Sequence, residues 1–325
     1  MRAFTDMRSL TRTFFLVQLF LITVTFASKG DKSQFYNHCI LKCHTENCKN
    51  DKEFRHNPSM DVQLLLWSCK DDCSYNCMWD TVEYFRAHGL QVPQFHGKWP
   101  FVRILGLQEP ASVLFSLLNF QIHFTMYRKF QREVRSSAPM SMVWTYFSLI
   151  CLTGWFWSTV FHARDKPFTE AMDYSCAFTI VLTLFYCMIL RLIYKNNKAF
   201  IVMTCLYISI LYTHLSHLWS GTINYGYNMK LNILFGFFTF AITMFWWYRN
   251  RQKLAHIYLV GWFNVLTVSV TLLELADFPP IFWVFDAHSL WHASTAPLAV
   301  LLYRFIILDC LYLRRQHSKT VLNMD

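Results

Sequence analysis

Five polar residues stand out in an otherwise apolar sequence because their types and spacing suit a metal-dependent hydrolase. Ser158 and His162 are four residues apart, and so are His288 and His292. Residues at this spacing share one face of an α-helix. Two imidazoles on one face can bind one zinc ion, and His162 would be the third ligand, from another helix. Three histidines leave the fourth position open, which predicts a catalytic rather than a structural zinc site.

Water activation is the chemistry that this pattern predicts. Zinc lowers the pKa of a bound water to about 7 and makes it a nucleophile. Asp173 would take or relay the proton, and Ser158 would donate a hydrogen bond to the oxyanion. In the alternative mechanism, Ser158 itself attacks the substrate and forms an acyl-enzyme. A histidine at the end of a membrane helix can also simply contact backbone or lipid headgroups, so the prediction depends on these residues meeting.

Three further residues are secondary candidates for supporting the site. His214 and His217 have i, i+3 spacing and therefore also share a face. We expect a structural role for this pair, with support of the metal ligands or contact with substrate as the alternative. Asp286 precedes His288 closely and is a candidate for supporting the ligands.

The composition indicates that these residues lie in a membrane protein. Of 325 residues, 54% are hydrophobic and only 15% are charged, whereas about 25% of an average soluble domain is charged. Seven apolar segments are each near the ~20 residues that a helix needs to cross a bilayer. These segments are residues 108–127, 141–162, 173–193, 199–219, 229–248, 256–276 and 281–308. We therefore expect an all-α membrane protein with a seven-transmembrane helix bundle.

Basic residues gather in every second connection between these segments and in the tail. They are Arg128, Lys129, Arg132 and Arg135; Arg191, Lys195 and Lys198; Arg249, Arg251 and Lys253; and Arg314, Arg315 and Lys319. The positive-inside rule places these connections and the C-terminus in the cytosol. The net charge of +10 is thus explained by the orientation of the chain in the membrane, and no nucleic-acid partner is expected. The N-terminus and the five polar residues fall on the opposite, lumenal side.

The first residues are typical of a secretory signal peptide, residues 1–27. Arg8 and Arg12 precede the short apolar run Phe14–Phe26, and small residues follow near Ala27. An uncleaved signal anchor is the alternative, although the apolar run is short for a span. A lumenal region over residues 28–105, a membrane core over 106–310 and a cytosolic tail over 311–325 complete the expected organisation.

The lumenal region contains six of the eleven cysteines, which are Cys39, Cys43, Cys48, Cys69, Cys73 and Cys77. An oxidising lumen favours three disulfides, whose pairing the sequence leaves open. A zinc cluster with nearby histidines is the less favoured alternative. We expect the region to brace the bundle, with recognition of the substrate's protein or glycan part as the alternative.

Several motifs resemble a known group of proteins. The S-x3-H at Ser158, the aspartate eleven residues after His162 and the H-x3-H at His288 resemble the CREST superfamily of membrane hydrolases. Longer stretches resemble one branch of it, the PER-like family, that of post-GPI attachment to proteins factor 3. They are C-x2-D-C-x3-C-M-W from Cys69, V-P-Q-F-H-G-K-W-P-F from Val92, Q-E-P-A-S from Gln108, W-F-W-S-T-V-F-H-A-R-D from Trp155 and F-D-A-H-S-L-W-H from Phe285. This resemblance covers nearly the whole chain after the signal peptide.

The resemblance implies an activity that the residues alone do not. Its members remodel GPI anchors by removing the sn-2 acyl chain of the phosphatidylinositol, which is a phospholipase A2-type carboxylic ester hydrolysis. The ligands of zinc would be His162, His288 and His292, with Asp173 and Ser158 beside the metal. GPI-anchored proteins would be the substrates and membrane lipid the surroundings, in the Golgi or alternatively the endoplasmic reticulum. The alternatives are a seven-helix receptor with a structural metal and a trafficking factor without chemistry of its own.

Overall fold

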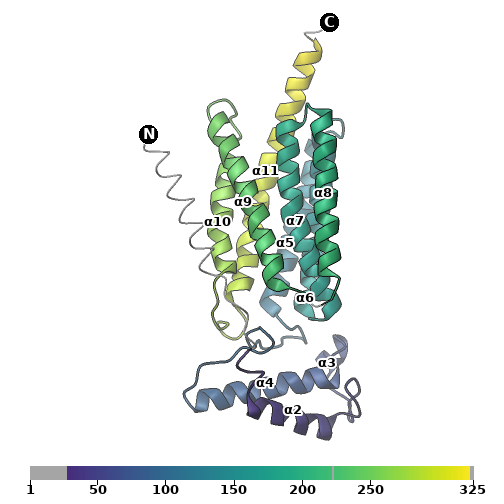
Figure 1. Ribbon diagram of the computed structural model, residues 1–325, viewed down its shortest axis with the longest axis vertical. Coiled ribbons are helices and arrows are strands. Elements are labelled where there is room, and N and C mark those ends of the chain that lie inside the picture. The colour runs from purple at the N-terminus through teal and green to yellow at the C-terminus, as the bar shows by residue number, and fades with distance from the viewer. Residues whose placement is uncertain (1–27, 222, 323–325) are drawn as a thin grey trace. The chain divides into compact units, whose positions relative to one another are not determined.

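A computed structural model describes residues 28–221 and 223–322. The predicted signal peptide, residues 1–27, lies outside this range. The chain forms two compact units (Figure 1). The first extends to Val102 and also includes Asp277–Trp283, and the second consists of Arg103–Ala276 and the residues from Val284 onward. The return of Asp277–Trp283 to the first unit was not expected.

The first unit is built on two helices that three disulfides join. α2 spans Gln34–Asn47, the short α3 spans Met60–Leu64 and α4 spans Cys69–Ala87. The disulfides are Cys39–Cys77, Cys43–Cys73 and Cys48–Cys69. This nested order means that α2 and α4 run antiparallel, each with its i, i+4 cysteines on one face. The prediction of three disulfides is confirmed, and the pairing uses all six cysteines of this unit, so the zinc alternative for this region is wrong.

The segment Asp277–Trp283 is held in the first unit by specific contacts. The indole Nε1 of Trp99 donates to Oδ1 of Asp277 over 2.5 Å. The backbone N of Val102 donates to the carbonyl of Trp283 over 3.0 Å. The ring of Trp283 also packs edge-on against Trp79, with 5.2 Å between centroids. The segment is therefore an integral part of this unit.

The second unit is a bundle of seven long helices, one for each predicted apolar segment. They are α5 (Pro110–Glu133), α6 (Ser141–Ala163), α7 (Pro167–Ile193), α8 (Asn197–Leu218), α9 (Tyr225–Asn250), α10 (Tyr258–Glu274) and α11 (Ala287–Leu322). The principal packing pairs close a ring in the order α5, α6, α7, α9, α10 and α11, and α8 packs outside it on α7. Pro110 and Pro167 begin their helices, where a missing N–H costs nothing.

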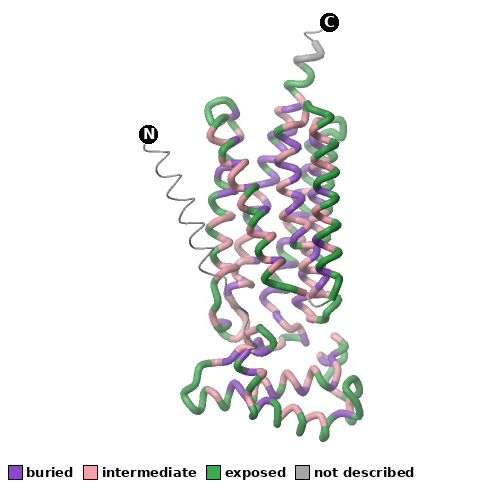
Figure 2. Tube along the Cα trace, in the orientation of Figure 1, coloured by how far each residue is buried: buried purple, intermediate pink, exposed green. Residues whose placement is uncertain are grey.

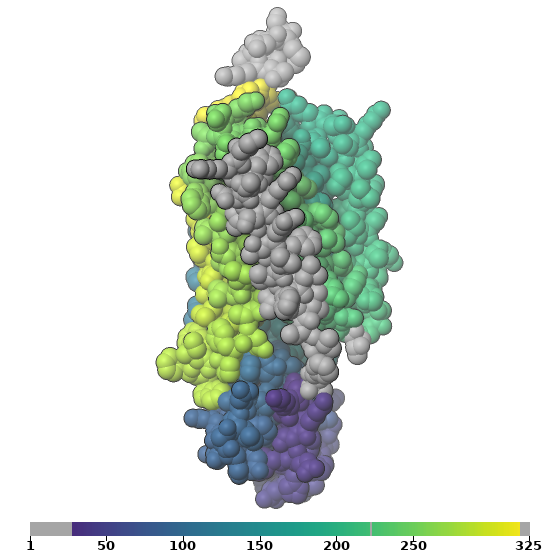
Figure 3. Space-filling model, turned by 60° about the vertical axis from the view of Figure 1, so that its left-hand side comes forward, coloured from purple at the N-terminus to yellow at the C-terminus, as the bar shows by residue number. Residues whose placement is uncertain are grey.

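The outer surface of the bundle is apolar. α8 is an apolar helix, yet only 11% of its most apolar stretch is buried within the protein. Figure 2 shows its exposed positions, and Figure 3 shows the face of the bundle that α9 and α10 form. Phe245 of α9 and Trp262 of α10 are among the exposed large apolar side chains. Four helices, namely α7, α8, α9 and α11, are long and apolar enough to cross a membrane by length and composition, and α10 is apolar but shorter. The fold is thus an all-α membrane protein, and the number of seven spans stays a prediction.

The helix α11 differs from its predicted bounds at both ends. It begins later than residue 281 because Phe282 and Trp283 have φ of 54° and 61°, a left-handed backbone that no helix contains. Asp286 and Ser289 then cap it reciprocally, with the backbone N of each bonded to the side chain of the other at 3.0 and 2.8 Å. At its other end α11 continues through most of the predicted tail.

A buried ion pair connects α7 and α11 within the second unit. The guanidinium of Arg191 donates through Nε and Nη2 to the carboxylate of Asp309, which is fully buried. Nε2 of His256 lies 3.0 Å from the same carboxylate. The guanidinium also lies 5.0 Å from the ring centroid of Trp246. These contacts satisfy both buried charges and join three helices and the segment before α10.

Candidate metal centre

The structure brings the three predicted metal ligands together. His162 comes from the last turn of α6, and His288 and His292 come from the first turns of α11. Nε2 of His288 lies 2.9 Å from Nε2 of His292 and 3.4 Å from Nε2 of His162. Potential ligand atoms of all three residues lie within 4.8 Å of one another. The predicted convergence of three histidines from two helices is confirmed.

Two carboxylates hold the opposite side of two of these rings. Oε2 of Glu109 lies 2.7 Å from Nδ1 of His162, and Oε2 of Glu274 lies 2.6 Å from Nδ1 of His288. A carboxylate at this position keeps the proton on Nδ1 and leaves the lone pair on Nε2. This arrangement is typical of metal-binding histidines, because it fixes the ring and increases its basicity.

The third histidine is held by α5 without a carboxylate. Nδ1 of His292 lies 3.0 Å from Oγ of Ser116, which lies 3.1 Å from Oγ of Ser158. Nδ2 of Asn119 donates to the carbonyl of His292 over 2.7 Å, and Oγ1 of Thr295 donates to Oδ1 of Asn119 over 3.2 Å. Both the ring and the backbone of His292 are thus fixed from the neighbouring helix.

The donor set fits a tetrahedral metal ion. With metal–nitrogen bonds of about 2.0–2.1 Å, tetrahedral ligands lie about 3.3–3.4 Å apart. The two Nε2 separations of 3.4 and 2.9 Å lie at and just below this spacing. Three imidazole lone pairs directed at each other repel, and a cation between them removes this repulsion. Nitrogen ligands in tetrahedral arrangement are those that zinc prefers.

The position of Glu109 follows from the local sequence. Pro110 begins α5, so Glu109 is the residue that precedes the helix. Its backbone N donates to the carbonyl of His162 over 3.0 Å, and the N of Gln108 donates to the carbonyl of Ala163 over 3.1 Å. These two bonds attach the start of α5 to the end of α6. They place the Glu109 side chain beside the His162 ring. Glu109 as a whole is only 5% exposed.

The metal-binding histidines differ in their exposure to solvent. The side chain of His162 is 2% exposed, whereas that of His288 is 35% exposed. Aromatic rings pack against the imidazoles: Trp291 stacks on His288 with centroids 5.5 Å apart, and Trp155 lies at a steep angle to His292 with centroids 5.3 Å apart. A substrate would therefore approach along His288, and the other two ligands are shielded from water.

The two predicted aspartates, Asp286 and Asp173, lie in different surroundings from each other. Asp286 caps α11, the helix that carries two of the ligands, and its support of the ligands themselves stays a prediction. Asp173 is half-buried on α7, next to Tyr174, whose ring lies 6.0 Å from that of Phe161, the neighbour of His162 in sequence. Its role in proton transfer stays a prediction.

The other predicted histidines make contacts among α7, α8 and α9. Nε2 of His214 lies 3.1 Å from Oδ1 of Asn228, and its ring centroid is 3.8 Å from that of Phe178. The ring of His217 packs edge-on against Tyr227 at 4.5 Å. These contacts suit the structural role that we expect for the pair, and contact with substrate stays a prediction.

Sequence reasoning missed Glu109, Glu274, Ser116 and Asn119 as site residues. Glu109 had a signal, because it lies in the Q-E-P-A-S motif, and a carboxylate next to an apolar segment is costly unless it is used. Glu274 had a similar one, at the end of the sixth segment. Ser116 and Asn119 had none, since small polar residues are ordinary within membrane helices.

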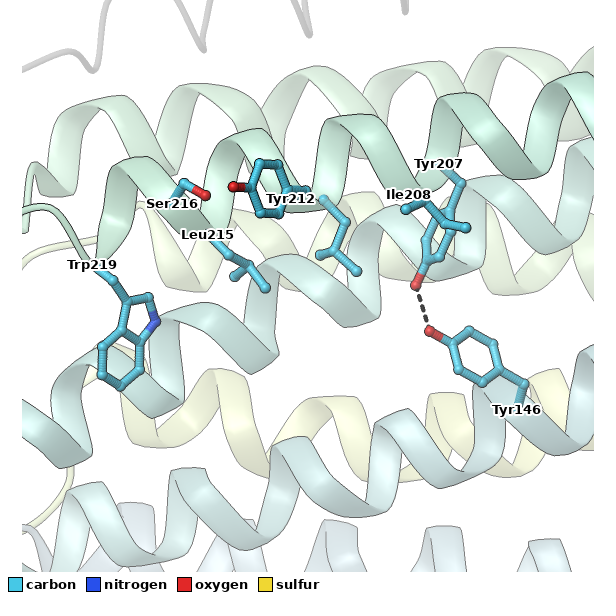
Figure 4. A pocket seen from close by; sticks show the side chains of 8 residues that line it. Tyr146, Tyr207, Ile208, Tyr212, Leu215, Ser216 and Trp219 are labelled. Carbon is cyan, nitrogen blue, oxygen red and sulfur yellow. Dashed lines mark hydrogen bonds between the residues drawn. The ribbon is translucent and has the colours of Figure 1, made fainter.

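A separate groove lies between α6 and α8 (Figure 4). Its volume is about 510 Å³, and its walls include Leu211, Leu215 and Trp219. At one end the hydroxyls of Tyr146 and Tyr207 lie 2.8 Å apart. The walls suit hydrocarbon, and the groove contains none of the predicted site residues.

Comparison with known proteins places the chain in a family. The sequence profile of the Per1-like family matches residues 59–310. The chain is 41% identical over 292 residues to the Mus musculus protein named GPI-specific phospholipase A2-like PGAP3, which covers 89% of this chain and 91% of the mouse protein. It is 40% identical over 294 residues to Post-GPI attachment to proteins factor 3 of Drosophila melanogaster, covering 88% and 90% of the two chains. With the Homo sapiens relative of the mouse protein it shares 39% identity over 292 residues, covering 89% and 91%.

Proposed function

The chain belongs to the Per1-like family, and we propose that it remodels GPI anchors by hydrolysing the sn-2 acyl ester of their phosphatidylinositol. The names of its relatives support action on GPI lipids. The observation that carries hydrolysis is the convergence of three Nε2 atoms whose rings are each held through Nδ1. A site built in this way suits a metal ion with a free position for chemistry.

Zinc is the metal that we assign to His162, His288 and His292. When bound, it supplies Lewis acidity, which activates water as a nucleophile and polarises an ester carbonyl. Glu109 and Glu274 hold two of the imidazoles in the tautomer that presents Nε2 to the metal. Their two negative charges also balance the charge of a divalent cation in a site that is largely closed to water.

The protein's own groups then position the substrate and move protons. The exposed side of His288 admits the ester, while Trp155 and Trp291 exclude water elsewhere. We assign to Asp173 the task of accepting a proton from the attacking water and passing it to the leaving alcohol. Acceptance and release of that proton balance over the reaction, so the carboxylate is regenerated.

We place the site on the lumenal side of an early secretory membrane, the Golgi first and the endoplasmic reticulum as the alternative. The connections α5–α6, α7–α8 and α9–α10 carry the basic clusters, and the site lies at the other end of these helices. By the positive-inside rule the clusters are cytosolic and the site is lumenal. The lipid part of GPI-anchored proteins lies in the lumenal leaflet. Its acyl ester would therefore lie at the same depth in the membrane as the site.

An assay on purified full-length protein tests the proposal. We expect about one zinc per chain and release of one fatty acid from a GPI-anchored substrate, seen by mass spectrometry. His292→Ala should abolish release while the protein still reaches its compartment. His317→Ala is the matched control, because this exposed histidine lies far along the same helix, and it should keep full activity.

Two other outcomes identify the competing functions. Zinc without turnover would support a receptor in which the metal is structural. Neither zinc nor turnover would support a trafficking factor. Full activity of His292→Ala would contradict the zinc mechanism directly.

A further inference from the structure

We propose that Ser158 is a positioning residue, which acts on His292 through Ser116, and that it is neither the nucleophile nor the oxyanion donor. The inference rests on the proposed metal site, but it needs no particular substrate. It also gives Ser116 a function: this serine is the direct acceptor for the one ligand that lacks a carboxylate partner.

The serines lie behind the imidazole of His292. Oγ of Ser158 is 3.1 Å from Oγ of Ser116, and Oγ of Ser116 is 3.0 Å from Nδ1 of His292. Nε2 of the same ring faces Nε2 of His288, 2.9 Å away. The hydroxyl of Ser158 therefore connects to the ring edge opposite the metal. Ser158 is 6% exposed and Ser116 is fully buried, so neither hydroxyl opens to solvent.

The direction of the hydrogen bonds argues against a nucleophilic serine. A neutral imidazole has one acceptor nitrogen and one donor nitrogen. When Nε2 of His292 binds a metal, Nδ1 carries the hydrogen and donates it to Oγ of Ser116. Ser116 can then donate its own hydrogen to Oγ of Ser158. A nucleophilic serine instead needs a base that accepts its proton, and this histidine has no acceptor left to offer.

The charge of the site explains why this ligand has a hydroxyl partner. Glu109 and Glu274 already supply two negative charges, which match a divalent cation. A carboxylate behind His292 as well would place one more charge at a buried position within a membrane helix, where charge is costly. A pair of hydroxyls orients the ring of His292 and adds no charge.

Metal affinity distinguishes this role from a role in chemistry. In purified full-length protein, titrated with zinc against a chelator, we expect Ser116→Ala to weaken zinc binding by about 10–100-fold, as for other groups behind metal ligands. Ser158→Ala should weaken it in the same direction but less, by up to about 10-fold. Deacylation by Ser158→Ala should recover at saturating zinc, and Ser158→Thr, which keeps the hydroxyl, should restore affinity.

Two buried serines serve as matched controls. Ser112 lies one turn before Ser116 on α5, and its Oγ has no hydrogen-bond partner among the residues that the structure describes. Oγ of Ser148 on α6 donates over 2.8 Å to the carbonyl of Trp144 in its own helix. Ser112→Ala and Ser148→Ala should leave the affinity for zinc unchanged.

The proposal is overturned if Ser158→Ala binds zinc as wild type does and stays inactive at saturating metal. An acyl adduct trapped on Ser158 would overturn it as well. If Ser116→Ala does not fold, the zinc affinities of Ser158→Ala and Ser158→Thr still test the proposal. Failure of the chain to deacylate GPI lipids would refute the proposed function alone, because the order of zinc affinities is measured without substrate.

Discussion

Glu109, the residue that precedes α5, contacts His162 of α6 twice. Its carboxylate Oε2 lies 2.7 Å from Nδ1 of the imidazole, and its backbone N donates to the carbonyl of the same histidine over 3.0 Å. One residue thereby fixes the ring and the main chain of a metal ligand. The pair is nearly closed to solvent, with side chains 6% and 2% exposed.

Replacement of Glu109 by glutamine should weaken metal binding. The amide can still accept a hydrogen bond from Nδ1, but it removes the negative charge that increases the basicity of the ring. We expect a loss of zinc affinity of about 10–100-fold, measured as zinc retained after dialysis against a graded chelator. Glu133→Gln is the control, since Glu133 lies at the other end of α5 in an exposed pair with Lys129. Equal zinc retention by both variants would contradict the role of Glu109.

Glu274→Gln should have a smaller effect than Glu109→Gln. The Glu274–His288 pair is shorter, at 2.6 Å, but its side chains are 18% and 35% exposed. Water screens a charge interaction more at such a position. The same chelator titration on both variants checks the order. A larger loss for Glu274→Gln would mean that burial does not decide the strength of these pairs.

Loss of the buried carboxylate between α7 and α11 should destabilise the bundle. In Asp309→Ala the guanidinium of Arg191 keeps its buried place without a counter-charge, which typically costs about 3–5 kcal/mol. We expect a clearly lower midpoint of thermal unfolding in detergent. The double variant Arg191→Met/Asp309→Leu removes both charges and should recover most of the loss. A double variant no more stable than Asp309→Ala would show that the charge itself is not the cause.

Removal of the Cys48–Cys69 disulfide should loosen the first unit alone. This bond closes a loop of 21 residues between the end of α2 and the start of α4, and a loop of this size is worth about 3 kcal/mol. The variant Cys48→Ser/Cys69→Ser should be cut faster by protease between these positions. Its zinc content should be unchanged, because every metal ligand lies in the second unit. Loss of zinc in this variant would contradict the independence of the site from this bond.

Much of the fold follows from simple physical signals in the sequence. Apolar stretches of bilayer length located all seven long helices, and prolines such as Pro110 and Pro167 began two of them. Six cysteines in a predicted lumenal region implied three disulfides, which are confirmed. Only their pairing needed the structure, because it depends on how α2 and α4 lie together.

The site was predicted in part. The i, i+4 spacing identified His288 and His292, and matching helix ends added His162. Glu109 and Ser116 could not be found in this way, because each acts through a residue on another helix. Periodicity states which side chains share a face, but not which faces meet. The role predicted for Ser158 depended on the same missing information, because its hydroxyl contacts Ser116 of α5, which in turn contacts Nδ1 of His292.

The first unit consists of two segments that are far apart in the sequence, and this affects the order in which the protein can fold. Its cysteine-rich helices are synthesised early, but Asp277–Trp283, which Trp99 and Val102 bind, is synthesised only after α10. The unit therefore cannot reach its final form while it emerges from the ribosome. Its disulfides can close first, and the last piece must arrive after six helices of the bundle have been translated. A mutation in α9 or α10 that delays membrane insertion would thus leave the first unit without its last segment.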